Sequence, residues 1–207
     1  MPYKSSASIR EKVAREAAVL LYSSQEKEYK QAKHRAARSL GTRILVSNKE
    51  IAEELDKIAD EIEGSARKDM IVQLRKDALT IMILLVDLHP RLVGSVWRGT
   101  AHKNSDIDIE AFFDDPQIVV ERLQNFLNVR GAGWQAMTKG EKNETAFHVY
   151  LHLPSGNEAE VIVRNPEKMN EAEKCEIYGD IIKGLKIHQL RTVLIEDPTQ
   201  KFTPFKN

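Results

Sequence analysis

Residues 92–113 read LVGSVWRGTAHKNSDIDIEAFF. A short apolar run leads into Gly94 and Ser95, and a later apolar run contains Asp106 and Asp108. Successive side chains of a β-strand point to opposite faces, so the two aspartates share one face while the alternating isoleucines face a core. The Cα atoms of the two aspartates would lie about 6–7 Å apart. The pattern therefore predicts a strand with two neighbouring carboxylates on one face.

A pair of carboxylates at this spacing is unfavourable unless a cation neutralises it. The repulsion is roughly 2 kcal/mol at an effective dielectric constant of about 20, and bound divalent cations would relieve it. Two metal ions about 3.5–4 Å apart, held by such carboxylates, are the usual arrangement for phosphoryl chemistry. Upstream, Gly94 permits a sharp turn, and Ser95 can begin a short helix whose free amide groups would face a phosphate. The stretch therefore predicts a phosphate-binding turn beside a metal site.

The stretch resembles the signature of the nucleotidyltransferase fold, which is shared by DNA polymerase β, poly(A) polymerases and tRNA CCA-adding enzymes. That signature is an apolar residue, Gly, then Gly or Ser, a spacer, and Asp-apolar-Asp-apolar. Here residues 93–95 (VGS) and a ten-residue spacer precede residues 106–109 (DIDI). Residues 98–100 (RGT) are similar to those of archaeal CCA-adding enzymes and minimal nucleotidyltransferases. A hairpin with two solvated aspartates is the alternative, and it leaves the spacing unexplained.

The resemblance implies an α/β fold, with a mixed β-sheet flanked by helices, that transfers a nucleoside monophosphate from an NTP to a hydroxyl and releases pyrophosphate. It implies that Asp106 and Asp108 hold two Mg²⁺ ions, with Mn²⁺ as a substitute, and that a carboxylate on a neighbouring strand completes the site. Glu160, a charge within the apolar residues 158–164 (EAEVIVR), is our candidate. Glu158 on the same face is the alternate. The family usually has Asp at this place, so Glu160 is one methylene longer.

The resemblance also implies where a nucleotide binds. Its phosphates would lie at Gly94 and Ser95, where the serine hydroxyl and amide can donate. Arg98 could pair with the triphosphate, because a guanidinium matches phosphate oxygens bidentately; a structural salt bridge is the alternative. Lys103, in the spacer, is a further candidate for the triphosphate. Glu110 continues the acidic face, and we expect it at the solvated end of the sheet rather than on a metal.

Hydrophobic periodicity predicts helices throughout residues 1–88 and alternating strands and helices in residues 89–207. We interpret the first part as an N-terminal helical region and the second as the nucleotidyltransferase domain, with a C-terminal helix at residues 184–196. Within the domain we expect Gly131 and Gly133 to flank a turn.

Two histidines deserve a separate interpretation, because a four-residue spacing can place metal ligands together on a helix. His148 and His152 lie in a segment that alternates as a strand does, where they would be too far apart to chelate one ion. We interpret both as residues of the sheet.

A basic helix is expected from a capping box at Ser23 and Glu26 to about Leu40. Its cations are Lys27, Lys30, Lys33, His34, Arg35 and Arg38. This side could lie along a nucleic-acid backbone. A solvated face with local ion pairs, such as Glu26 with Lys30, is the alternative that we favour.

The amino-acid composition limits which binding partners and which cellular compartment we expect. Lys plus Arg equals Asp plus Glu at 31 each, so no overall field attracts polyanions. The single Cys175 allows no internal disulfide, which fits a reducing cytoplasm. No segment reads as a signal peptide or a membrane span, so we expect a cytoplasmic protein without a membrane partner.

The acceptor hydroxyl is left open. Similarity to CCA-adding enzymes implies an RNA end, as in tRNA, whereas similarity to minimal nucleotidyltransferase antitoxins implies a protein hydroxyl; a small molecule is a third choice. A module that binds nucleotide or RNA without turnover is the alternative that the glutamate at position 160 favours.

Overall fold

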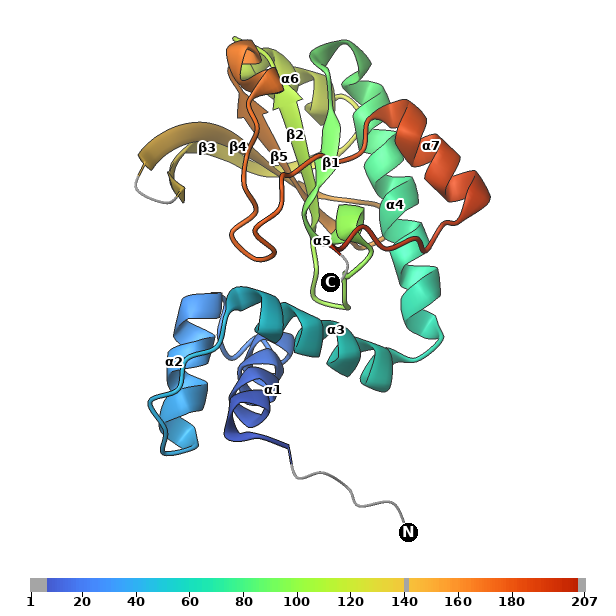
Figure 1. Cartoon of the computed structure of the whole chain (residues 1–207). Helices are drawn as coiled ribbons and strands as arrows, with labels where there is room; N and C mark the ends of the chain where they lie inside the picture. Colours follow the sequence, from blue (N-terminus) through green and yellow to red (C-terminus); the bar gives the residue numbers. More distant parts are fainter. Residues whose placement is uncertain (1–6, 140–141, 205–207) are drawn as a thin grey trace. The chain divides into compact units, whose positions relative to one another are not determined.

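A computed structural model describes residues 7–139 and 142–204 of the chain (Figure 1). The tertiary contacts divide the chain into two compact units. The first comprises residues up to Arg67 with the short segments 102–104 and 174–180, and the second comprises residues 68–101, 105–173 and those from Ile181 onward. This division differs from the boundary expected after residue 88. The extent of the domains as independent folding units stays a prediction.

The first unit is built from three helices: α1 (Ile9–Tyr22), α2 (Tyr29–Ser39) and α3 (Asn48–Glu63). Ser8 begins α1 and Ser47 begins α3, each as part of a capping box with a glutamate three residues later. The alanines and branched aliphatic residues on the facing sides of the helices form one buried cluster. Amphipathic periodicity therefore gives a small helical core.

The capping box expected at Ser23 is wrong. The Ser23 hydroxyl donates instead to the carbonyl of Val19, 2.8 Å away, at the end of α1. Ser24 then adopts a left-handed φ of 56°, which turns the chain. Helix α2 consequently begins at Tyr29, and Glu28 precedes it without a capping hydrogen bond from its side chain.

The second unit contains a five-stranded sheet in the order β1-β2-β5-β4-β3 (Figure 1). Its strands are β1 (Arg91–Val93), β2 (Ile107–Phe112), β3 (Asn128–Lys139), β4 (Lys142–His152) and β5 (Glu158–Arg164). Strands β2 and β5 are parallel, and the other neighbours are antiparallel. This mixed sheet with helices confirms the predicted fold class.

Helices cover one face of this sheet. They are α4 (Ala66–Leu84), α6 (Pro116–Gln124) and α7 (Ile187–Glu196), while α5 (Gly94–Arg98) follows β1 and the 3₁₀ turns η1 (Val86–Leu88) and η2 (Pro166–Asn170) lie in connections. The core combines apolar residues of α4, α6 and α7 with the alternating apolar residues of β2, β4 and β5. The acidic and polar residues of these strands therefore point to the opposite face. The C-terminal helix is confirmed at α7.

The turn expected at Gly131 and Gly133 is wrong, because both glycines lie inside β3. The register of β3 against β4 shifts between Val129 and Gly131, as in a β-bulge, and glycine is common at such places. A Cβ added at either glycine would meet no heavy atom within 4 Å. The two glycines pair with Tyr150 and His148, so they leave the polar face of the sheet open beside those rings.

A buried arginine fixes the segment that follows β1. The guanidinium of Arg75 donates to four carbonyl groups, those of Val96, Trp97, Pro198 and Gln200, at 2.8–3.2 Å. Burial lowers the pKa of Arg75 to about 10. The hydrogen bonds join α4 to α5 and to the C-terminal segment. They hold α5 in position although so short a helix has little stability of its own.

Among residues 7–139 and 142–204, no helix is both long enough and apolar enough to cross a lipid bilayer. The cytoplasmic location inferred from the single cysteine stays a prediction.

Candidate active site

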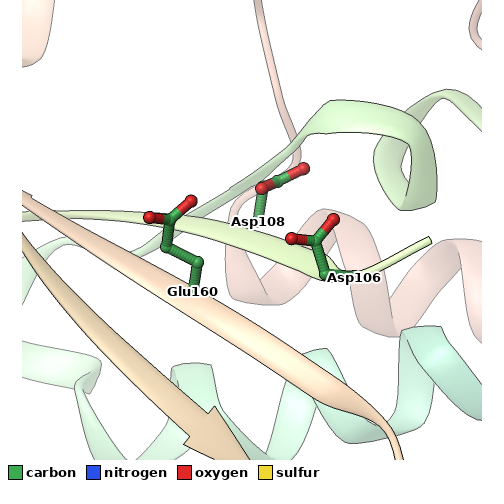
Figure 2. A group of neighbouring side chains, drawn as sticks. All are labelled: Asp106, Asp108 and Glu160. Atoms are coloured by element: carbon green, nitrogen blue, oxygen red, sulfur yellow. The ribbon is translucent and has the colours of Figure 1, made fainter. Parts of the chain in front are cut away.

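Three carboxylates meet on the polar face of the sheet (Figure 2). Asp106 directly precedes β2, Asp108 lies within β2, and Glu160 lies within β5. The parallel pairing of the two strands sets Asp108 directly opposite Glu160. One carboxylate oxygen from each residue lies within 4.8 Å of the other two. The structure therefore brings together the three residues that the sequence analysis selected as metal ligands.

The three negative charges are poorly compensated. Burial, followed by the charges of Asp106, Glu160 and Glu110, raises the pKa of Asp108 well above its ordinary value. Partial desolvation and the charges of Glu160 and Glu158 also raise the pKa of Asp106. Within the described part of the chain, no lysine or arginine forms an ion pair with Asp106, Asp108 or Glu160. An all-oxygen donor set with excess negative charge fits Mg²⁺ or Mn²⁺, which prefer carboxylate ligands.

Gly94 brings the turn after β1 into contact with this cluster. Its φ is +68°, and a Cβ added there would lie 2.0 Å from Oδ2 of Asp108. Val93 pairs with Asp108 across the two strands, so the register itself forces the close approach. Ser95 follows in the first turn of α5 and is half-buried. The predicted phosphate-binding residues Gly94 and Ser95 therefore lie beside the predicted metal ligands.

Arg98 and Lys103 make other contacts in the structure. The buried guanidinium of Arg98 donates to the carbonyl of Phe202 at 2.9 Å and lies over the ring of Trp97 at 4.4 Å. Lys103 belongs to the first unit, where its ammonium lies 5.2 Å from the ring centre of Tyr22. These contacts hold the local structure. Nucleotide binding by Arg98 and Lys103 stays a prediction.

The expectation that Glu110 lies at a solvated end of the sheet is wrong. Its side chain is only 4% exposed and forms ion pairs with Arg91, at 2.5 Å, and Arg164, at 2.9 Å. Strands β1 and β5 flank β2, and each contributes one of these arginines. Glu110 is thus a neutralised structural residue, whereas the three carboxylates of the cluster are not neutralised.

Glu160 has a partner that was not predicted from the sequence. His148 lies on β4, as expected for a residue of the sheet, and its Nδ1 is 2.6 Å from Oε1 of Glu160. His152 also lies on β4, so both histidines are confirmed as residues of the sheet. Alternation along β4 could have placed His148 on one face, but the contact with Glu160 depends on the pairing of β4 with β5.

A cavity of about 300 Å³ opens beside the acidic cluster, and Asp106 and Glu160 line one side of it. Arg130, Tyr150 and Glu158 contribute other parts of the wall. Arg130 and Glu158 pair with each other at 2.6 Å, and both are largely exposed. The alternate carboxylate, Glu158, is therefore compensated, which leaves Glu160 as the third ligand candidate.

Neutralising Asp108 should stabilise the protein without metal. A carboxyl group whose pKa is raised by folding destabilises the native state as pH rises from the ordinary value near 3.8 through the raised value. We expect Asp108→Asn to melt several degrees above the wild type in EDTA at neutral pH, and to lose the stabilisation that Mg²⁺ or Mn²⁺ gives the wild type. Thermal melts between acidic and neutral pH, with exposed Asp114→Asn as the control, measure this. Equal responses of both variants to metal would contradict the metal site.

Adding a methyl group at Gly94 should disturb the cluster. Gly94→Ala combines about 1 kcal/mol of left-handed strain with a collision against Asp108. Gly156→Ala is the matched control, because its φ is +88° and no heavy atom lies within 4 Å of the added Cβ. We expect both variants to lose stability by about the same strain energy, Gly94→Ala to lose further stability through the collision, and only Gly94→Ala to bind Mn²⁺ at least about tenfold more weakly. Titrations of Mn²⁺ into the folded variants decide this, and equal affinities would contradict the predicted contact.

A known protein family matches the part of the chain that contains this site. The nucleotidyltransferase domain family matches residues 84–188, which is slightly more than half of the chain. Solved structures with similarity include Cid1 in complex with the UTP analogue UMPNPP (19% identity over 55% of this chain and 37% of that chain, TM-score 0.35). They also include a cytoplasmic RNA terminal U-transferase (20% identity, 55% and 37%, TM-score 0.34).

The chain spans less than two fifths of the length of those two solved chains, at 37% of each. No curated protein matches the sequence significantly. The match to the family model, supported by the mixed sheet and the motif in residues 92–113, shows that this chain belongs to the nucleotidyltransferase domain family.

Proposed function

We propose that this protein transfers a nucleoside monophosphate from an NTP to an acceptor hydroxyl and releases pyrophosphate. The observation that carries the proposal is the convergence of three carboxylates within 4.8 Å, beside a turn where a Cβ at Gly94 would collide with the side chain of Asp108. Asp106, Asp108 and Glu160 would hold two Mg²⁺ ions, with Mn²⁺ as a substitute. When bound, such ions neutralise the phosphate charge and activate the attacking oxygen.

The residues of the chain would act mainly by positioning. Asp108 would be held rigidly as a metal ligand, because β2 lies between two paired strands, and Asp106 directly precedes that strand. Ser95 would donate its hydroxyl and amide to the polyphosphate. Glu160 would orient the acceptor oxygen and take up its proton, since it faces the cavity beside the cluster. Positioning and charge neutralisation of this kind account for most of the catalysis expected of phosphoryl transfer.

Pyrophosphate release from each of the four NTPs, with Mg²⁺ or Mn²⁺ and total RNA, tests the proposal. We expect release by the wild type and a loss of at least about 100-fold in Asp108→Asn, because a metal ligand is removed. Asp114→Asn, at an exposed position after β2, should keep full activity. If NTP binds but no pyrophosphate appears with RNA, protein or small-molecule acceptors, the protein is a binding module and the proposal fails.

We propose an RNA end as the acceptor, and the cations of α2 support this choice. Lys30, His34 and Arg38 are spaced by four residues, so they share one exposed side of the helix. The local pair expected between Glu26 and Lys30 is not formed, because Glu26 pairs with Arg35 at 3.0 Å. Within the described residues, Lys30, His34 and Arg38 have no ion pair. An unneutralised row of cations suits a phosphate backbone.

Removing two of these cations should weaken RNA binding in a salt-dependent way. Affinity falls as salt rises, so the slope of log affinity against log salt is negative. We expect Lys30→Gln with Arg38→Gln to make this slope less steep by about 1.4, which corresponds to the loss of two phosphate contacts with a single strand. Arg15→Gln with Lys57→Gln removes the same charge from cations that are already paired with glutamates of α3, and should leave the slope unchanged.

Binding of a labelled single-stranded RNA at several salt concentrations measures both slopes. Equal slopes for the two double variants would exclude this face of α2 as an RNA contact. Transfer of label to a protein instead of to RNA would favour the protein hydroxyl acceptor.

A further inference from the structure

The third carboxylate is held by side chains from the neighbouring strand. Tyr150 of β4 is directly opposite Glu160 of β5, and His148 lies two residues before Tyr150 on the same face. Nδ1 of His148 lies 2.6 Å from Oε1 of Glu160. The side chains of His148 and Glu160 are 7% and 18% exposed. The contact is therefore largely shielded from water, and a hydrogen bond to a charged group is strong in such surroundings.

Tyr150 extends the contact into a network across three strands. It faces Glu160 across the strand pair, and partial burial, followed by hydrogen bonding to the Glu160 carboxylate, raises the pKa of Tyr150. The hydroxyl of Tyr150 accepts a hydrogen bond from Nε2 of Gln135 on β3, 2.8 Å away. The rings of His148 and Tyr150 stack with centres 6.3 Å apart and planes at 21°. His148 and Tyr150 are thus each held in place by a contact besides the one to Glu160.

The chemistry of His148 indicates that it serves Glu160. Nε2 of its imidazole is buried and has no hydrogen-bond partner in the described part of the chain. Leaving a buried polar atom unpaired costs about 1–3 kcal/mol, so packing alone would favour an apolar residue at this position. The hydrogen bond from Nδ1 to Glu160 offsets that cost and gives a reason for an imidazole.

Glu160 needs such support for a physical reason. A glutamate side chain has three rotatable bonds, and the negative charges of Asp106 and Asp108 push its carboxylate away from the cluster. A carboxylate has two oxygens, so one can remain with His148 while the other is offered to a cation. Fixing the carboxylate in advance reduces the ordering cost when a cation binds.

We propose that His148 and Tyr150, with Gln135 bracing Tyr150, are positioning residues that hold the Glu160 carboxylate in place as a metal ligand. This inference rests on the proposed metal site. It assigns a role to side chains of β3 and β4, which supply none of the three carboxylates.

Mn²⁺ binding by the full chain without nucleotide, followed by the paramagnetic signal of the free ion, tests this role apart from activity. We expect His148→Leu to weaken Mn²⁺ binding about tenfold, as is typical when a partner of a ligand is lost. His148→Asn keeps an N–H donor near the position of Nδ1 and should restore the affinity to within about threefold. In a Glu160→Gln background, His148→Leu should cause no further loss, because the two residues act through one ligand.

His152→Leu is the matched control. It makes the same substitution on the same face of β4, at a half-buried residue whose Nδ1 lies 3.9 Å from Glu158. It should leave Mn²⁺ affinity unchanged. An unchanged affinity of folded His148→Leu, or an equal loss with and without Glu160, would overturn the inference.

A second variant covers the case in which His148→Leu does not fold. Tyr150→Phe removes only a hydroxyl from a residue that is 37% exposed, and should weaken Mn²⁺ binding about threefold in wild type but not in Glu160→Gln. Unchanged affinity would then overturn the inference. Asp108→Asn separates the two hypotheses: if it binds Mn²⁺ as the wild type does, the metal site itself fails. If it loses binding while His148→Leu and Tyr150→Phe do not, only the positioning role fails.

Discussion

Repulsion among Asp106, Asp108 and Glu160 is the constraint around which the sheet is built. The parallel pairing of β2 and β5 sets Asp108 opposite Glu160. The two residues cannot move apart without breaking this pair of strands. The apolar residues that alternate with these carboxylates are fully buried against α4, α6 and α7. Their burial is worth about 1.5–3 kcal/mol for each large side chain, so several of them together outweigh a repulsion of roughly 2 kcal/mol between two partly screened charges. The core therefore holds the carboxylates together in advance of any ligand.

The distribution of arginines on the same sheet explains why the cluster stays negative. Glu110 is the next residue on the acidic face of β2, and it receives two guanidinium groups, from Arg91 and Arg164. Both arginines come from strands that flank β2. The pairing neutralises the one acidic residue that is fully buried, and it leaves Asp106 and Asp108 without a protein cation among the described residues. The sheet thus separates a structural ion pair from an uncompensated site that favours a divalent ion.

Features encoded within one strand were predictable, and features that depend on pairing were not. The faces of Asp106, Asp108 and Glu160 follow from period-two alternation in short apolar segments. The burial of Glu110 depends on arginines 19 residues before it and more than 50 after it, and the contact of His148 with Glu160 depends on the register of β4. Local rules also failed where tertiary contacts prevailed. Gly131 suggested a turn but lies at a bulge within β3, because glycine serves both purposes.

The placement of α5 shows how the site depends on distant parts of the second unit. A helix of five residues has almost no stability of its own. Gly94 begins it beside Asp108, and Gly99 ends it with a φ of +71°, where a Cβ would lie 2.6 Å from the carbonyl oxygen of Gln200. Arg75 donates to carbonyls on both sides of this contact. The C-terminal segment therefore helps to fix the turn that would hold a polyphosphate, through its contacts with Arg75 and Gly99. Arg98 and Gly99 of the Arg-Gly-Thr sequence both contact that segment. Arg98 donates to the carbonyl of Phe202, and Gly99 has no side chain to collide with Gln200.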